Sequence, residues 1–430
     1  MKYRLHLSAL FVAIIAVAVG GLFLSDTFAR QRRASSDRIN STRTATNVAS
    51  STLTFSAPIE LTKTPISPIF FQQDGEPEIH VDIYGNIYVT AINGVPGGTD
   101  LWKSTTKGTS FGYLGEPDGA QDHCSTLLQC AGLGGGDDST DISPGGYLYV
   151  SSLWIGNVTV STSKDGGTGG TANTDQAWQV NPAAAAVIAD DRQWLAAYGP
   201  QTLNMTYRQA PGTGDLFFVK STDAGKTFGA PVLVRSGNST EGNLVVDPYN
   251  GNLYTTTIPA NALNQIHLLK STDGGATWAE STAYTGPIGT NPAHKFTILA
   301  VDRGGNIHLV FSQSNVDGSY HIYLTSSADQ GVSWLSPVQV DSGTGNSTFG
   351  VMPWVVAGSP GVVDITWLGS TTSPNTFPSA WYVFFAQTTN ALSTTPTFSQ
   401  VQVTTQSSNK PWKPRSARIL HDSDRPGRQR

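Results

Sequence analysis

The stretch Ser271-Thr272-Asp273-Gly274-Gly275-Ala276-Thr277-Trp278 decides the fold, because it recurs along the chain. Close copies run from Ser221 to Phe228 and from Ser327 to Trp334, and a degenerate copy begins at Ser163. Two weaker copies carry Thr106 and Asn390 at the place of the Asp. The six central positions are 50 to 61 residues apart. A fixed period of this length indicates a repeat architecture.

Each copy has the chemistry of a tight turn. An Asp carboxylate accepts hydrogen bonds from backbone N–H groups just ahead of it, and glycine adopts backbone angles that other residues avoid. The terminal aromatic residue is expected to pack under the turn and begin the next strand. We therefore interpret the acidic residue of each copy as structural rather than catalytic. These residues are Asp165, Asp223, Asp273 and Asp329.

A second repeated element precedes most of the turns. It is an apolar segment, a Gly-containing turn and another apolar segment, as in residues 78–89, 244–254 and 298–308. This pattern predicts a β-hairpin. Each unit of about 55 residues therefore contains four strands, A to D, with hairpins joining A to B and the Asp turns joining C to D. Six such units predict an all-β protein, a β-propeller of six recognisable four-stranded blades.

The octet resembles the Asp-box, or bacterial neuraminidase repeat, of sialidase-like β-propellers, and the resemblance covers residues 76–404. It implies a propeller fold. It does not imply one activity, because such boxes occur in sialidases, in other glycoside hydrolases and in non-enzymatic receptors. Function therefore depends on the site and not on the fold.

The number of blades has two interpretations. Phe55–Leu61 is similar to the D strand expected at Phe228–Val234, and residues 398–403 also fit a D strand. The chain then has seven D-like segments but six A–C sets. Either the first segment pads a six-bladed ring, or the protein is seven-bladed with an incomplete last blade.

Composition and charge exclude several classes of protein. Charged residues make up 13% of the 430 residues and hydrophobic residues 38%, which argues against a helical bundle and against disorder. The net charge is −5, yet residues 1–43 and 410–430 each carry +5, so residues 44–409 carry −15. Such an acidic body is a poor partner for nucleic acid. We expect a monomer that binds a glycan or another extracellular ligand.

The chain divides into four segments. Residues 1–29 have a basic start and an apolar run, so they are either a cleaved signal peptide or an uncleaved membrane anchor, which would be the protein's only membrane contact. Residues 30–52 are a linker, 53–409 the propeller and 410–430 a basic disordered tail. In both cases the body is expected to be secreted or otherwise extracytoplasmic.

Two features of one Gly-rich loop admit alternatives. Cys124 and Cys130 are expected to form a local disulfide in an exported protein, and a metal site is the weaker interpretation. Asp137, Asp138 and Asp141 either bind calcium through their hard oxygens or form a solvated turn.

Chemistry is expected on the face of the ring that holds the D–A and B–C connections, opposite the Asp turns. The resemblance to sialidases implies three arginines that bind a substrate carboxylate, a Tyr nucleophile assisted by a Glu, and an Asp acid/base. By position these are, for substrate binding, Arg192, Arg208 and Arg235, and for catalysis Tyr207, Glu241 and, as the acid, Asp191 or Asp138.

The sequence also departs from the sialidase pattern. Glu76-Pro77-Glu78 stands where sialidases have Arg-Ile-Pro in the first blade, and Met352-Pro353-Trp354 stands where a Tyr is expected. Glu76 and Glu78 share one face of a strand, so they form either a carboxylate pair or a polar strand end. Two functions remain open: a non-catalytic propeller that binds a glycan or cell-envelope ligand, and an exo-α-sialidase or other glycoside hydrolase.

Overall fold

The structure is a computed structural model. It describes residues 46–47, 53–62, 75–94, 97–118, 135–154, 157–167, 178–185, 190–210, 212–293, 296–342, 349–372 and 380–405. Within these residues the chain is all-β, and none of it forms a helix long and apolar enough to span a membrane. Cys124 and Cys130 lie outside the described residues, as does the N-terminal apolar run.

The strands form successive antiparallel sheets in chain order, as the repeat predicts. The first sheet is β2 (Gly75–Val81), β3 (Ile87–Ile92), β4 (Thr99–Ser104) and β5 (Gly112–Gly115). The second is β6 (Asp138–Ile142), β7 (Leu148–Trp154), β8 (Asn157–Ser163) and β9 (Gln179–Asn181). The third is β10 (Asp190–Tyr198), β11 (Thr202–Gln209), β12 (Leu216–Ser221) and β13 (Val232–Arg235).

The fourth sheet is β14 (Asn238–Glu241) and β15 (Val245–Val246), both paired to β16 (Leu253–Pro259), then β17 (Gln265–Ser271) and β18 (Ala279–Thr285). The fifth set is β19 (Ile298–Val301), β20 (Ile307–Ser314), β21 (Tyr320–Ser327) and β22 (Val338–Gln339). The sixth is β23 (Phe349–Ala357), β24 (Val363–Ser370), β25 (Tyr382–Thr388) and β26 (Thr397–Gln402).

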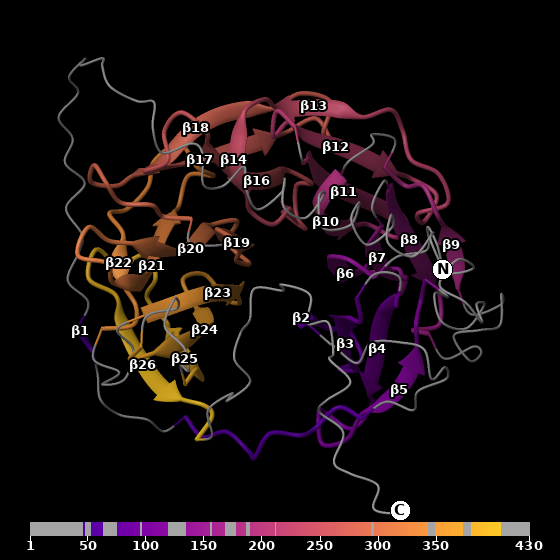
Figure 1. Cartoon of the computed structure of the whole chain (residues 1–430), viewed down its shortest axis with the longest axis horizontal. Helices are drawn as coiled ribbons and strands as arrows, with labels where there is room; N and C mark the ends of the chain where they lie inside the picture. The colour runs from indigo at the N-terminus through magenta and orange to yellow at the C-terminus, as the bar shows by residue number, and fades with distance from the viewer. Residues whose placement is uncertain are drawn as a thin grey trace, which may run out of the picture.

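The sheets follow one another around a common centre (Figure 1). Strands β2, β6, β10, β19 and β23 lie nearest the centre, and the later strands of each sheet lie farther out. The fifth and sixth sets are joined by a short parallel contact between Tyr320 and Phe349. Apolar side chains fill the space between neighbouring sheets.

The Asp turns have the expected hydrogen bonds. Asp273 Oδ1 accepts from the Thr277 N–H at 2.9 Å, and the Ser271 hydroxyl oxygen accepts from the Gly275 N–H at 2.9 Å. The same bonds recur at Asp223 and Asp329. Gly275 has a φ of +95° and lies against the Phe218 ring, so a side chain there would clash. Each turn therefore also packs against the preceding sheet.

The first and last turns use neutral side chains for the same purpose. Thr106 accepts from the Ser110 N–H through its hydroxyl oxygen at 3.0 Å, and Asn390 accepts from the Thr397 N–H at 3.0 Å. The weak sequence copies are thus real copies of the turn. A carbonyl or hydroxyl oxygen satisfies the backbone donor without a charge.

One expected strand is absent from the described part of the chain. Residues 53–62, which include the expected first D strand, do not pair with a sheet. Phe55 instead packs edge-on against Phe385 of β25, with 5.3 Å between ring centroids. This side-chain contact takes the place of the expected backbone hydrogen bonds between strands. The strand that does pair with β26 is β1 (Thr46–Asn47), which runs parallel to it.

The Asp turns predict an acid-dependent stability. Hydrogen bonds to the Thr277 side chain and backbone lower the pKa of Asp273 to about 2 from an ordinary value of 3.8. Because the folded pKa is depressed, this turn stabilises the fold fully above pH 4 and loses its contribution as pH falls through about 2. Asp273→Asn should lower the melting temperature at pH 5 by a few degrees, and the difference from wild type should shrink towards pH 2.

Thr106→Val is the matched control, since it removes a neutral acceptor from an equivalent turn. Its effect on the melting temperature should not depend on pH over this range. An Asp273→Asn difference that stayed constant down to pH 2 would contradict the assignment.

Candidate functional site

Two β-bulges direct side chains towards the centre of the ring. The register shifts between Gly75 and Glu78 on β2 and between Asp191 and Trp194 on β10. At each bulge a residue other than glycine has a left-handed backbone, with φ +49° at both Glu76 and Arg192. Bulges that re-aim side chains, and strained backbone of this kind, are concentrated at functional sites.

The two bulges bring their side chains together. Arg192 Nη1 donates to Glu76 Oε2 at 2.6 Å, and Asp137 Oδ1 lies 3.5 Å from the same nitrogen. The guanidinium also lies over the rings of Trp194 and Phe296, at 4.6 Å and 4.3 Å from their centroids. Aromatic faces attract a cation. Two aromatic rings stacked on the guanidinium and two carboxylates therefore hold Arg192 in place.

A second arginine is held in the same way. Arg208 Nε lies 2.7 Å from Glu241 Oε2, and Arg208 Nη2 donates to Asp191 Oδ2 at 3.2 Å. Arg208 Nη1 donates to the Ser239 carbonyl. We call the six residues Glu76, Asp137, Asp191, Arg192, Arg208 and Glu241 the rim cluster. It has four carboxyl groups and two guanidinium groups.

The rim cluster lies at the end of the sheets opposite the Asp turns. On β10 and β11, Asp191 pairs with Arg208 at one end of the ladder and Tyr198 with Thr202 at the other. The turn that carries Asp223 follows Ser221, which pairs with Leu203 at that second end. The sequence analysis placed the Asp turns and the expected binding residues on opposite faces, and the register has this arrangement.

More carboxyl groups lie behind the rim cluster, between the first two sheets. Glu78 Oε2 accepts from the Thr140 N–H at 2.7 Å, and His80 lies between Glu78 and Asp141 at 3.8 Å and 3.5 Å. Burial lowers the pKa of His80, but Glu78 and Asp141 outweigh it, so the pKa is raised. Asp138 is buried at 2% exposure.

Burial raises the pKa values of several of these acids. Desolvation, opposed by Arg192, raises the pKa of Asp137 to about 6. Desolvation, opposed by Arg208 and supported by Asp191, raises the pKa of Glu241 to about 7. Burial and the neighbouring Glu78 raise the pKa of Asp138 well above its ordinary value. Acids with shifted pKa values that lie close together are typical of binding and catalytic sites.

Tyr207 faces away from the rim cluster. Its ring is buried at 0% exposure and stacks on Phe217, with 5.7 Å between centroids. Neighbouring residues of a strand point to opposite faces, and Arg208 takes the face of Glu241. Burial and the nearby Asp190 raise the pKa of Tyr207 above its ordinary value. Glu241 therefore pairs with Arg208, and the structure does not bring it to Tyr207.

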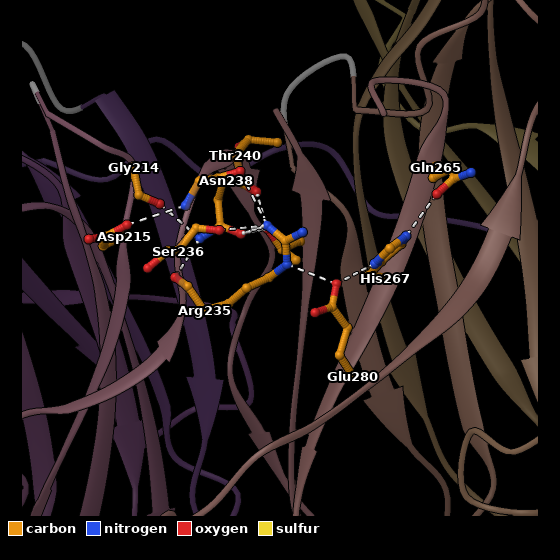
Figure 2. Close-up of polar contacts among 11 residues, drawn as sticks. Gly214, Asp215, Arg235, Ser236, Asn238, Thr240, Gln265, His267 and Glu280 are labelled. Atoms are coloured by element: carbon orange, nitrogen blue, oxygen red, sulfur yellow. Dashed lines mark hydrogen bonds and ion pairs between the residues drawn. The ribbon is translucent and has the colours of Figure 1, made fainter. Parts of the chain in front are cut away.

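Arg235 is held in a separate network at the outer edge (Figure 2). Its Nε donates to Glu280 Oε1 at 2.8 Å, and its Nη1 donates to Asn238 Oδ1 at 2.9 Å and to two backbone carbonyls. Glu280 also contacts His267, which bonds to Gln265. The structure thus brings Arg192 and Arg208 to one cluster and commits Arg235 to the edge between β13 and β18.

The three acids considered for calcium point to different partners. Asp137 contacts Arg192, Asp138 is buried near Glu78, and Asp141 accepts from the Ala197 N–H at 2.7 Å. Across the described residues, no three His, Cys, Asp or Glu side chains are arranged to share a metal ion.

Two parts of the site were not assigned from the sequence. The sequence predicts Glu76 as a carboxylate of the site but not as the partner of Arg192, and it does not indicate Phe296. A signal for the first is present, because Glu76-Pro77-Glu78 and Arg192-Gln193-Trp194 lie at the start of equivalent inner strands. The contact with Phe296 depends on packing across the ring and has no local pattern.

No protein-family model matches the chain, and no curated protein matches its sequence. Its fold is similar to that of an ulvan lyase of polysaccharide lyase family PL25 bound to -[GlcA(1-4)Rha3S]-, with a TM-score of 0.51, 10% identity, and coverage of 75% of this chain and 81% of the lyase. At this identity the likeness is one of fold alone.

Two more distant likenesses are to glycan-acting proteins. The NanB sialidase of Streptococcus pneumoniae gives a TM-score of 0.43 at 12% identity, over 82% of this chain and 64% of the sialidase. The endosialidase of phage phi92 gives 0.45 at 12%, over 84% and 70%. Neither is close enough to bear on the function of this chain.

The Arg208–Glu241 pair predicts a large effect on stability. Glu241 is fully buried and Arg208 mostly buried, so Arg208→Met leaves a buried carboxyl group without its cation. Breaking such a pair costs about 3 kcal/mol. Chemical denaturation at pH 8, where Glu241 would otherwise be ionised, should show this loss in the free energy of unfolding.

The double variant Arg208→Met/Glu241→Leu is the control, because an apolar pair leaves no charge to desolvate. It should recover most of the lost stability. A single variant as stable as wild type would mean that the two side chains do not depend on each other.

Proposed function

We propose that this chain is an exported β-propeller that binds a carbohydrate on the rim cluster. The observation that carries the proposal is the pairing of both arginines with two carboxyl groups each. Each guanidinium therefore already faces carboxyl groups of the protein, and the Arg192 Nε, which has no hydrogen-bond partner among the described residues, is buried. The exposed carboxylates of Glu76 and Asp191 can accept hydrogen bonds from sugar hydroxyl groups, which are the donors that a carbohydrate presents.

Two further features support this assignment. The fold is that of a protein that holds a polysaccharide, the ulvan lyase. The apolar N-terminal run of the sequence is typical of exported proteins, and exported proteins encounter carbohydrate ligands. The network around Arg235 lies away from this surface, so it does not complete a three-arginine site of sialidase type.

For the architecture we propose six blades in an incompletely closed ring. Ile79 and Val81 on β2 are 61% and 60% exposed, whereas Leu195 and Ile298 on other inner strands are 5% and 2% exposed. An inner strand is covered when a blade packs on each side of it. These exposures support the alternative in which a further blade, represented by Phe55–Leu61, lacks its A–C strands.

Carbohydrate binding predicts a loss of affinity when the exposed carboxylates are neutralised. Isothermal titration calorimetry with soluble neutral oligosaccharides should identify ligands of the wild type. Asp191→Asn and Glu76→Gln should each weaken binding about tenfold, since a hydrogen bond to a charged group contributes about 1.5 kcal/mol or more. Glu280→Gln, which removes a carboxylate at the outer edge, should bind as wild type.

A melting curve for each variant separates lost affinity from lost structure. If none of the oligosaccharides binds the wild type, or if Glu280→Gln has the same effect as Asp191→Asn, the binding surface is assigned wrongly.

A second candidate is glycoside hydrolysis, favoured by the two carboxyl groups on Arg208. Glu241 is buried with a raised pKa, and Asp191 is 37% exposed in its side chain. A buried carboxyl group with a raised pKa beside a more exposed one is the arrangement of an acid and a base or nucleophile. Glu241 would donate the proton to the leaving oxygen, and Asp191 would activate water or attack.

Hydrolysis predicts a pH dependence with a definite sign. Glu241 acts only while it holds its proton, so activity should fall as pH rises through about 7. Glu241→Gln should lower the rate by at least about a hundredfold while Asp273→Asn leaves it unchanged. Release of reducing ends from the oligosaccharides that bind measures the rate, and binding without release would assign the site to binding alone.

A further inference from the structure

The charged groups of the rim cluster are arranged in depth. The side chains of Glu76, Asp191 and Asp137 are 49%, 37% and 25% exposed. Those of Arg192 and Arg208 are 11% and 19% exposed. The carboxylates therefore form the outer layer, and the guanidinium groups lie beneath them. A ligand that approaches from solvent meets negative charge first.

Buried acids behind this layer lack partners. Glu241 is 1% exposed; its Oε1 has no hydrogen-bond partner among the described residues, and its Oε2 has only the ion pair with Arg208. Asp138 is 2% exposed, and neither of its oxygens has a well-formed hydrogen bond there. An unsatisfied buried oxygen costs free energy unless something donates to it. Because Glu241 points into the rim cluster, a donor from a ligand at that cluster would satisfy it.

The surroundings of the two arginines leave them little capacity for an anion. Arg192 is between Glu76 and Asp137 with aromatic rings beneath it, and Arg208 is between Asp191 and Glu241. A carboxylate or sulfate ligand would meet these acids first, because the Arg192 Nε that lacks a hydrogen-bond partner among the described residues is buried. It would also pass the outer carboxylates, where like charges repel.

We propose that the rim cluster is specific for an amine-bearing carbohydrate, such as an oligomer of glucosamine with free amino groups. This rests on the proposed carbohydrate-binding function and names its ligand class. The ammonium group lies against Glu76 and Asp191, and its three N–H donors match carboxylate acceptors beside the N–H groups that Arg192 donates to Glu76 and Arg208 donates to Asp191. The neighbouring hydroxyl groups donate to Asp137 and to the inner oxygen of Glu241.

The experiment compares three matched tetrasaccharides. The glucosamine tetramer is cationic, the N-acetylglucosamine tetramer has the same backbone without the charge, and the galacturonate tetramer is anionic. Titration calorimetry at about pH 6.5 should give an affinity for the first at least about tenfold above the second, with the third weakest. The preference for the amine should weaken at high salt, because the outer carboxylates are exposed.

Variants test whether the preference for the amine depends on the exposed carboxylates of the outer layer. Glu76→Gln and Asp191→Asn should each reduce the ratio of glucosamine to N-acetylglucosamine affinity about threefold or more. Glu280→Gln removes the same charge at the outer edge and should leave the ratio unchanged. Melting curves of all three variants show whether each remains folded.

The outcomes separate the ligand class from the function. Galacturonate binding as tight as glucosamine binding, or equal affinity for the amine and its acetylated form, overturns the amine preference and leaves carbohydrate binding in place. If none of the three tetrasaccharides or any neutral oligosaccharide binds, the proposed function fails as well. A ratio that falls equally in Glu280→Gln overturns the assignment to the rim cluster.

Discussion

The position of the Arg192 guanidinium is the constraint on which the candidate site depends. Trp194 and Phe296 hold it from beneath, and Glu76 holds it from another sheet. Both partners of the Arg192–Glu76 pair come from bulges with left-handed backbone, so the contact is fixed by strained segments rather than by flexible loops. Because β2 and β10 belong to different sheets, this pair also connects the first sheet to the third.

The acids around Arg192 and Arg208 differ in their exposure to solvent, and burial raises the pKa values of two of them. Asp137 and Glu241 are desolvated because the rings and arginines exclude water around them, and their pKa values rise accordingly. Glu76 remains half exposed at the outer layer. Groups of one chemical type thus differ in their exposure to solvent because they lie at different depths.

The sequence predicted the antiparallel four-stranded sheets and their turns, but not the number of blades or the contacts of the site. The octet around Asp273 encodes its own turn, because the acceptor, the glycine and the aromatic residue act within eight residues; the four-stranded sheets followed from its period. Arg235 shows the opposite case. Arg235 precedes a D–A connection and Arg208 a B–C connection, so the sequence predicts both on the same face. The partner of Arg235, Glu280, comes from β18, and no local sequence pattern specifies a contact between sheets. The side of β11 taken by Tyr207 likewise depended on strand register.

The neutral turns at Thr106 and Asn390 affect the order in which the sheets lose stability in acid. The middle sheets close their turns with carboxylates that lose their acceptor charge on protonation, whereas the first and sixth close theirs with groups that do not titrate. The turns of the first and sixth sheets therefore keep their full stabilisation at a pH where the turns with Asp273 and Asp329 have lost the contribution of the charge. Amide exchange in acid should reach the middle of the sequence before its ends, the reverse of ordinary fraying from the termini.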